Sequence, residues 1–247
     1  MMATGTAIGI IGSNGRMGQA IKVELAAQDI ALAGGVDKDE GDLSALVAAS
    51  DVLIDFSTPA TLHDNLEDCM LARKPIVIGT TGLEASHHQL IDAAARSIPV
   101  LQTGNMSLGV NLLSVLVEEA ARRLGNDWDI EIVEMHHRHK VDAPSGTALL
   151  LGEAAARGRG IELALNSERG RDGITGARKP GAIGFASLRG GSVAGDHQVI
   201  LATEGERIEI GHRAENRSIF ARGAIKAALW LADQSAGRYD MKNVLGL

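Results

Sequence analysis

The feature that most constrains the fold is an alternation of short apolar runs with helical stretches in the N-terminal part of the chain. Apolar runs at 7–11, 30–36, 51–56, 75–78 and 99–102 have the length of buried strands. Stretches with helical spacing of apolar residues fall between them, at 17–28, 61–72 and 85–95. Because alternating strands and helices are joined by right-handed crossovers, this part predicts a Rossmann-type α/β domain with a doubly wound parallel sheet.

A glycine-rich turn directly follows the first predicted strand. Residues 12–18 read GSNGRMG, a GxxGxxG variant of the dinucleotide fingerprint. In such a turn the first glycine permits the bend, the second lets a pyrophosphate approach the backbone, and the third lets the helix pack on the sheet. The N–H groups at the start of the helix would face the same anion. The alternative is a tight turn without a ligand. The expected cofactor contacts are Gly12, Ser13, Asn14, Gly15, Arg16 and Met17.

An acidic residue ends the second predicted strand. Asp37 lies about 20 residues beyond the glycine turn, where an acid binds the ribose hydroxyls of NAD. The next residue, Lys38, could pair with the additional phosphate of NADP. The sequence therefore predicts NADH or NADPH as the cofactor and leaves the choice open. Asp37 could instead be a polar residue of a solvated acidic turn.

Two further loops follow the fourth and fifth predicted strands. The carboxyl ends of parallel strands meet at one edge of the sheet, where doubly wound folds bind their ligands. We therefore expect these loops to contact the nicotinamide end of the cofactor. Alternatively, the first loop is only a strand-to-helix connection capped by a threonine, without a role in binding. The residues concerned are Gly79, Thr80 and Thr81, and then Thr103, Gly104, Asn105 and Met106.

The pattern changes in the second half of the chain. We expect helices at 110–124 and 145–156, a strand at 130–135, a long loop at 158–181, and strands at 183–188, 197–203 and 207–212. A turn at Glu204 and Gly205 would join the last two strands. These elements predict a second, α+β domain over 108–216. A final helix at 218–232 could return to the first domain, which would then comprise 1–107 and 217–247.

Histidines and cations gather in residues 134–147, EMHHRHKVDAPSGT. The segment leaves a strand and enters a helix capped by Ser145, whose first N–H groups would bind a carboxylate. His136 could give or accept a proton near neutral pH. This is the layout for a carboxylated substrate that takes up one proton and one hydride. The expected catalytic residues are His136 and Lys140, and the expected substrate contacts are His137, Lys140, Ser145, Gly146 and Thr147.

Less specific interpretations of this segment exist. It could be a solvated basic loop, since runs of charge usually lie on the surface. His137 and His139 could bind a metal from one face of a strand, but neither a cysteine nor a well-spaced acid completes such a site, so we expect no metal. His139 could simply make structural hydrogen bonds.

Composition excludes other classes of protein. The net charge of -7, with one Tyr, two Trp and three Phe, argues against nucleic-acid binding. No apolar run approaches the roughly 18 residues of a membrane span, and glycines interrupt the first apolar segment, so we expect neither a membrane anchor nor a signal peptide. The single cysteine, Cys69, cannot form an internal disulfide, which favours a cytoplasmic protein. Its helical setting beside Met70 and Leu71 predicts core packing.

Residues 134–149, EMHHRHKVDAPSGTAL, resemble the signature of the dihydrodipicolinate reductase family, also called 4-hydroxy-tetrahydrodipicolinate reductases. The resemblance covers nearly the whole chain. It continues in GSNGRMG at Gly12, GTTG at Gly79, NMSLGVN at Asn105, IGFASLRGG at Ile183, GDHQV at Gly195 and the C-terminal YDMKNVLGL.

The resemblance implies reduction of 4-hydroxy-tetrahydrodipicolinate, via dihydrodipicolinate, to tetrahydrodipicolinate in the diaminopimelate route to lysine. It also implies a homotetramer built through the sheets of the substrate domains, which makes 108–216 a substrate-binding and tetramerisation domain. Carried over by position, His136 would be the proton donor or acceptor and Lys140 the second proton donor. His137, Gly146 and Thr147 would bind the carboxylates of a small cyclic dicarboxylate.

Two other functions remain open from the residues alone. A related amino-acid or semialdehyde dehydrogenase would share the glycine turn, but the second of these needs a nucleophilic cysteine, and Cys69 lacks an electropositive setting. A nucleotide-sensing protein without catalysis would keep the turn and would not need the histidine run.

Overall fold

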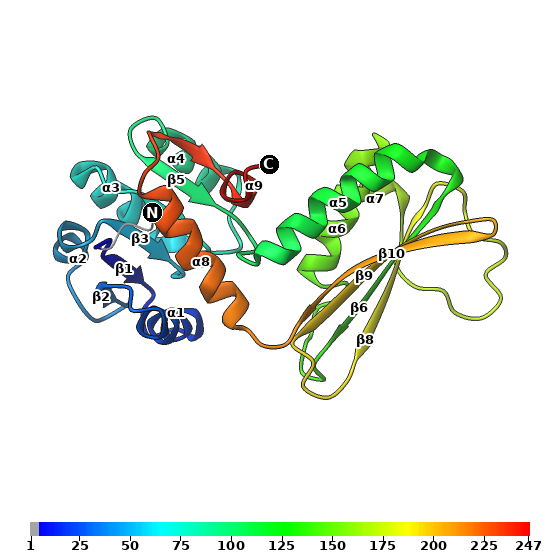
Figure 1. Cartoon of the computed structure of the whole chain (residues 1–247), viewed down its shortest axis with the longest axis horizontal. Coiled ribbons are helices and arrows are strands. Elements are labelled where there is room, and N and C mark those ends of the chain that lie inside the picture. The colour runs from blue at the N-terminus through cyan, green and yellow to red at the C-terminus, as the bar shows by residue number, and fades with distance from the viewer. Residues whose placement is uncertain (1–4) are drawn as a thin grey trace. The chain divides into compact units, whose positions relative to one another are not determined.

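The computed structural model describes residues 5–247, which form two compact units (Figure 1). Unit 1 combines the chain up to Leu108 with Ser218–Leu247, and unit 2 is Gly109–Arg217. Residues 1–4, at the start of the predicted dinucleotide-binding domain, lie outside the described residues.

Unit 1 is built on a six-stranded parallel sheet in the order β11-β5-β4-β3-β1-β2. The parallel α/β sheet predicted from the sequence is confirmed. Since β1 lies between β2 and β3, the chain winds first to one side of β1 and then to the other, which makes the carboxyl ends of β1 and β3 a topological switch point. The strands are β1 (Ile8–Ile11), β2 (Leu32–Val36), β3 (Val52–Asp55), β4 (Ile76–Ile78), β5 (Pro99–Gln102) and β11 (Gly237–Tyr239).

Helices cover both faces of this sheet because successive strand residues point to opposite sides. Ile10 of β1 packs in the core that contains α8, whereas its neighbour Ile11 packs in the core that contains α3 and α4. The helices are α1 (Arg16–Ala27), α2 (Leu43–Ala49), the 3₁₀ turn η1 (Pro59–Thr61), α3 (Leu62–Ala72), α4 (Ala85–Ala94), α8 (Ser218–Leu231) and α9 (Met241–Leu245).

Unit 2 is built on a mixed sheet in the order β10-β9-β6-β8-β7. β6 lies parallel to β8 and antiparallel to β9, and β9 and β10 form the predicted hairpin with Gly205 at its turn. Helices α5 and α6 share one core with the sheet, in which Val117 and Leu151 pack with Ile132. The elements are α5 (Leu108–Leu124), the 3₁₀ turn η2 (Gly125–Asp127), β6 (Asp129–His136), α6 (Gly146–Arg159), α7 (Leu163–Asn166), β7 (Ser167–Glu168), β8 (Ile183–Arg189), β9 (Gly195–Thr203) and β10 (Glu206–Ala214).

The predicted loop at 158–181 is wrong in its first part. Helix α6 continues to Arg159, and α7 and β7 follow before the loop begins. Gly158 lies within α6 and lets it pack closely on α5, since a Cβ there would overlap the carbonyl of Glu118 and lie 2.9 Å from the Cβ of Ala121. The glycine that ends the helix is Gly160, in the left-handed conformation at the C-cap.

None of the helices in the described part of the chain is both long and apolar enough to cross a membrane.

Candidate active site

The glycine turn of unit 1 is fixed by the backbone of both neighbouring strands. The N–H groups of Gly12 and Ser13 donate to the carbonyl of Val36 at 2.9 and 3.0 Å. Gly12 has φ +80°, and a Cβ there would lie 2.7 Å from the carbonyl oxygen of Phe56. A Cβ on Gly18 would overlap the Gly12 carbonyl, so this glycine lets α1 begin directly against the turn. The glycines at both ends of the motif are therefore required by close backbone packing.

The start of α1 is suited to hold an anion. Its N-cap is Gly15, which brings no side chain to the free N–H groups of the first turn, and Gly15 and Arg16 are exposed. The exposed amides and the positive end of the helix dipole face the solvent side of the turn. The residues present fit a pyrophosphate, because a negative group there would meet donors without displacing a side-chain cap.

Asp37 lies against the glycine turn. Its carboxylate accepts hydrogen bonds from the N–H groups of Lys38 at 2.8 Å and Asn14 at 2.7 Å. These two backbone donors hold the pKa of Asp37 below its usual value, so the group stays ionised. Asn14 also donates through its side chain to Glu40 at 2.8 Å. The structure thus brings Asp37 to the glycine turn, beside the exposed Lys38.

The loop after β4 is tied to a buried carboxylate that the sequence prediction did not include. Asp55, at the end of β3, is fully buried and accepts from the N–H and hydroxyl of Ser57 at 2.8 and 2.5 Å and from Asn65 at 3.2 Å. The hydroxyl of Thr80 lies 3.4 Å from the same carboxylate. Burial raises the pKa of Asp55 against these hydrogen bonds. The sequence signal that could have indicated Asp55 is its position as an acidic residue at the end of an apolar strand.

This network changes what can be expected of the residues at 79–81. The side chain of Thr80 is buried and directed to Asp55, whereas Thr81 is exposed. A Cβ on Gly79 would overlap the Phe56 ring, so the glycine lets the two loops approach each other. Asp55 therefore couples the loops that follow β3 and β4 at the switch-point edge.

The segment 103–106 forms a compact turn after β5. The Thr103 hydroxyl donates to the Asn105 carbonyl at 3.0 Å and accepts from the Asn105 N–H at 3.1 Å. The Asn105 side chain accepts from the N–H of Ser107 at 2.9 Å. Gly104 is exposed and Met106 is buried in the core of unit 1. Backbone groups near Gly104 are therefore the accessible part of this segment.

In unit 2, the last residue of β6 is a histidine bound to a buried carboxylate. His136 Nδ1 lies 2.6 Å from Oε2 of Glu134, and Glu134 is 1% exposed. Arg189 donates to both oxygens of this carboxylate, at 2.8 and 2.9 Å, and the N–H of Ser145 donates at 3.2 Å. Burial acts to raise the pKa of Glu134, but the hydrogen bonds from Arg189 and His136 outweigh it and lower the pKa to about 2. Glu134 is therefore an ionised, fully bonded carboxylate.

A second histidine packs on the first. The rings of His136 and His197 meet edge to face, with centroids 5.0 Å apart. His197 Nε2 lies 3.0 Å from the Ser145 hydroxyl, which caps α6 by accepting the Ala148 N–H at 3.1 Å. Burial lowers the pKa of His197 to about 4, which keeps the ring neutral. Glu134, Arg189 and His197 were given no role from the sequence, although all three lie within the segments that carry the family resemblance.

The remaining predicted residues lie in the turn between β6 and α6 and at the start of α6. Lys140 Nζ is 2.8 Å from Asp142, and His137 Nε2 is 3.3 Å from Arg217. Burial, followed by the nearby Arg217, lowers the pKa of His137. Gly146 is exposed and Thr147 half-buried in the first turn of α6.

His137 and His139 do not lie on one face of a strand, which was the arrangement considered for metal binding. Strand β6 ends at His136, so His137 and His139 lie in the following turn rather than on a strand face, with ring centroids 6.3 Å apart. Within residues 5–247, the side chains grouped closely enough to hold an ion are His63, Asp64 and Glu67, which are exposed on α3. Cys69 is fully buried, and burial raises the pKa of its thiol to about 12, as expected of a core residue.

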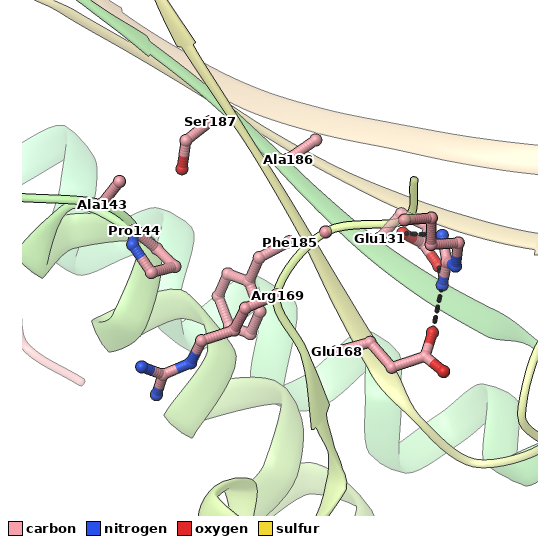
Figure 2. Close-up of a pocket in the computed structure, with 10 residues that line it drawn as sticks. Glu131, Ala143, Pro144, Glu168, Arg169, Phe185, Ala186 and Ser187 are labelled. Carbon is pink, nitrogen blue, oxygen red and sulfur yellow. Dashed lines mark hydrogen bonds and ion pairs between the residues drawn. The ribbon is translucent and has the colours of Figure 1, made fainter. Parts of the chain in front are cut away.

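A cavity of about 460 Å³ lies next to the cluster in unit 2 (Figure 2). Ala143 and Pro144, which precede the helix cap Ser145, line one side, and the Phe185 ring lines another. Ser187, which pairs with Glu134 in the register of β6 and β8, also lines the cavity. Glu131 and Glu168 lie away from these residues in Figure 2, and Arg171 pairs with both carboxylates at 2.8 and 2.5 Å.

A doubly wound sheet with a glycine turn at its switch point, joined in one chain to a unit that carries a carboxylate-bound histidine, defines the class of nicotinamide-dependent oxidoreductases. The chain matches the family models of the dihydrodipicolinate reductase N-terminus over residues 6–106 and C-terminus over residues 109–245. It therefore belongs to the dihydrodipicolinate reductase family.

Individual relatives agree with this assignment. The chain is 63% identical over 246 residues to the 4-hydroxy-tetrahydrodipicolinate reductase of Zymomonas mobilis, with 97% of each chain covered. It is 52% identical to that of Parvibaculum lavamentivorans, over 96% of this chain and 97% of the relative. Among solved structures, a dipicolinate-bound dihydrodipicolinate reductase from Paenisporosarcina sp. TG-14 has the same fold, with TM-score 0.78, 23% identity, and 98% and 99% of the two chains covered.

Proposed function

We propose that this chain catalyses the reduction of 4-hydroxy-tetrahydrodipicolinate, via dihydrodipicolinate, to tetrahydrodipicolinate with NADH or NADPH, in the diaminopimelate route to lysine. The observation that supports this proposal most directly is the His136–Glu134 pair, which is joined to the N-terminus of α6 through Ser145. This arrangement combines a proton-exchanging group with a site for carboxylates. The reductases that are 63% and 52% identical over nearly the whole chain support the same reaction.

In this proposal, residues 1–107 and 217–247 bind the dinucleotide. Amides at the start of α1 and the side chain of Arg16 would hold the pyrophosphate, and Asp37 would accept hydrogen bonds from the ribose hydroxyls. When bound, the cofactor supplies a hydride. The nicotinamide end would be held by the loops at 79–81 and 103–106. The assigned residues are Gly12, Ser13, Asn14, Gly15, Arg16, Met17, Asp37, Lys38, Gly79, Thr80, Thr81, Thr103, Gly104, Asn105 and Met106.

Residues 108–216 bind the cyclic dicarboxylate. Lys140 and His137 would pair with its carboxylates, and the first N–H groups of α6, at Gly146 and Thr147, would donate to one carboxylate at the positive end of the helix. Ser145 holds this end in place through its bonds to Ala148 and His197. The function of this unit is therefore to neutralise and orient two negative groups.

Proton transfer is assigned to His136, with Lys140 as a second donor. The Nδ1 atom of His136 is engaged by Glu134, so Nε2 is the atom that exchanges a proton with the substrate. The hydroxylated substrate first loses water to give dihydrodipicolinate. One hydride and one proton then reduce one double bond of the ring. Lys140, whose ammonium now pairs with Asp142, carries three donors and can reach a carboxylate or supply a proton.

The test is NADH and NADPH oxidation with substrate made in place by the upstream synthase. His136→Ala should lower kcat by about 10²–10⁴-fold, the usual contribution of a positioned acid or base. His139→Ala, which removes an exposed histidine of the same turn, is the matched control and should keep its activity. If His136→Ala keeps turnover within a few-fold of the unmodified enzyme, the proton role is refuted. For Lys140→Ala, a raised KM with unchanged kcat would reduce its role to binding.

The choice of cofactor depends on the end of β2. Asp37 favours NADH, and the adjacent Lys38 leaves room for the extra phosphate of NADPH, so both should be used. Replacing Lys38 by Ala should raise the KM for NADPH and leave that for NADH unchanged. A semialdehyde dehydrogenase is not supported, because the thiol of Cys69 is buried and its pKa is raised to about 12.

The proposal includes a homotetramer and a cytoplasmic location. On the face of the unit 2 sheet opposite α5 and α6, apolar side chains recur at Val133, Met135 and the 51% exposed Leu188. Such a face favours association with another sheet of the same kind, and light scattering of the purified enzyme would measure the mass. The single buried cysteine is consistent with a reducing compartment.

A further inference from the structure

Glu134 is a buried carboxylate that contacts the proposed proton donor and the proposed carboxylate site at the same time. We infer that Glu134, held by Arg189, is a positioning residue that fixes His136 in the tautomer with its proton on Nδ1. The inference rests on the proposed function of His136 and assigns the atom that exchanges the proton.

The strand geometry creates this arrangement. Residues 134 and 136 are two apart in β6, so their side chains point to the same side of the sheet. Arg189 is the residue of β8 directly paired with His136, and from that position it donates Nη1 to Oε2 and Nη2 to Oε1 of Glu134. The bidentate pair leaves the carboxylate one orientation, in which Oε2 also faces His136 Nδ1 at 2.6 Å.

The charge state of Glu134 decides the tautomer of His136. An ionised carboxylate only accepts hydrogen bonds, so the nitrogen that faces it must carry a proton. A carboxylate already held by an arginine remains ionised through the pH range in which imidazole titrates. Therefore Nδ1–H is retained in both charge states of the ring, and Nε2 alone gains or loses a proton.

The other side of the ring is kept open by a glycine. A Cβ at Gly195, at the start of β9, would lie 3.0 Å from His136 Nε2. A side chain there would crowd the atom that must meet the substrate. His136 is 8% exposed.

The second oxygen of Glu134 links the histidine to the start of α6. Oε1 accepts the N–H of Ser145 at 3.2 Å, and Ser145 is the N-cap residue of α6. One carboxylate thus fixes both the imidazole and the helix end that would bind the substrate carboxylate. The titratable and charged groups around the ring are Glu134 on β6, Arg189 on β8, His197 on β9, and His137 and Lys140 in the following turn.

The direct test is the tautomer itself. In ¹⁵N-labelled enzyme, long-range ¹⁵N–¹H correlation at pH 9 separates Nδ1–H from Nε2–H rings, and the spectrum of His136→Asn identifies the signals of His136. We expect the Nδ1–H form in the unmodified enzyme and a mixture in Glu134→Gln. An Nε2–H form in the unmodified enzyme would overturn the inference, whether or not Glu134→Gln folds. This readout does not depend on the substrate, so it remains valid even if the proposed reaction is wrong.

The kinetic test uses the pH profile of kcat. Glu134→Gln should lower kcat about 10²-fold or more over the whole profile, because a neutral amide no longer fixes the proton on Nδ1 of His136. The KM for NADH should stay within two-fold. The matched control is Glu131→Gln, which also removes an arginine-paired carboxylate of β6, but on the opposite face. A Glu134→Gln profile that coincides with that of Glu131→Gln would overturn the inference.

Discussion

Replacing Gly12 by alanine should destabilise unit 1 through two separable effects. The residue has φ +80°, and a side chain in the left-handed region costs roughly 1–2 kcal/mol. The new Cβ would also lie 2.7 Å from the oxygen and 2.8 Å from the carbon of the Phe56 carbonyl, which are backbone atoms that cannot rotate away. Overpacking of this kind costs about 1–3 kcal/mol, so the total loss should be about 2–5 kcal/mol.

Two control glycines separate the effects. Gly205 has φ +82° but nothing within 4 Å of a Cβ, so Gly205→Ala should lose the conformational part alone. Gly104 has nothing within 4 Å of a Cβ and no positive φ, so Gly104→Ala should be neutral. A loss of 1 kcal/mol lowers the melting temperature by about 3 °C. The melting temperature, followed by circular dichroism, should therefore fall by about 6–15 °C for Gly12→Ala and about 3–6 °C for Gly205→Ala. The packing argument is refuted if Gly12→Ala melts no lower than Gly205→Ala.

Three further predictions follow from the same contacts. Because the pKa of Glu134 is lowered from 4.5 to about 2, the group contributes about 3 kcal/mol above pH 4.5, and this is lost as the pH falls toward 2. Between pH 5 and pH 3, the free energy of unfolding measured with urea should therefore fall more for the unmodified enzyme than for Glu134→Gln. Equal decreases would contradict the ion pairing. Cys69 should resist a thiol reagent at pH 8 until the protein unfolds, since burial raises its pKa to about 12, and rapid labelling of the native protein would show that the site opens. Gly146→Ala should keep or raise the melting temperature, because helix α6 gains propensity and a Cβ there meets nothing within 4 Å. It should nevertheless raise the substrate KM if the amide lies against a carboxylate, and an unchanged KM would remove Gly146 from the substrate site.

Elements with a strong local signal could be predicted from the sequence. Strands β1, β3 and β4 are buried at every residue and appear as continuous apolar runs, and α5 has one apolar side. Ser145 was recognisable as a helix cap because it follows Pro144 and precedes an apolar helix, and its hydroxyl does accept from Ala148. A short element without a buried apolar run could not be found in this way. Strand β11 has three residues, Gly237–Tyr239, and owes its existence to pairing with β5.

A local run of histidines and cations indicates residues 134–147 as a candidate site, whereas contacts that depend on pairing between strands could not be predicted. His136 and Lys140 stand in a dense local run of histidines and cations. Arg189 and His197 come from β8 and β9, and only the register that places them beside β6 gives them a role. Thr80 shows the opposite case, since its position was foreseen but its hydroxyl is turned to the buried Asp55.

The discontinuous course of unit 1 also affects the order in which the chain can fold. Ile8, Ile10 and Val77 share a core with Ala224 and Ile225 of α8, which is synthesised after all of unit 2. Unit 2 is one continuous stretch, Gly109–Arg217, so its core is complete before α8 leaves the ribosome. During synthesis the part of this core that α8 covers is therefore exposed until that helix emerges, while α1 already packs on the rest. Exposed apolar surface of this kind favours aggregation.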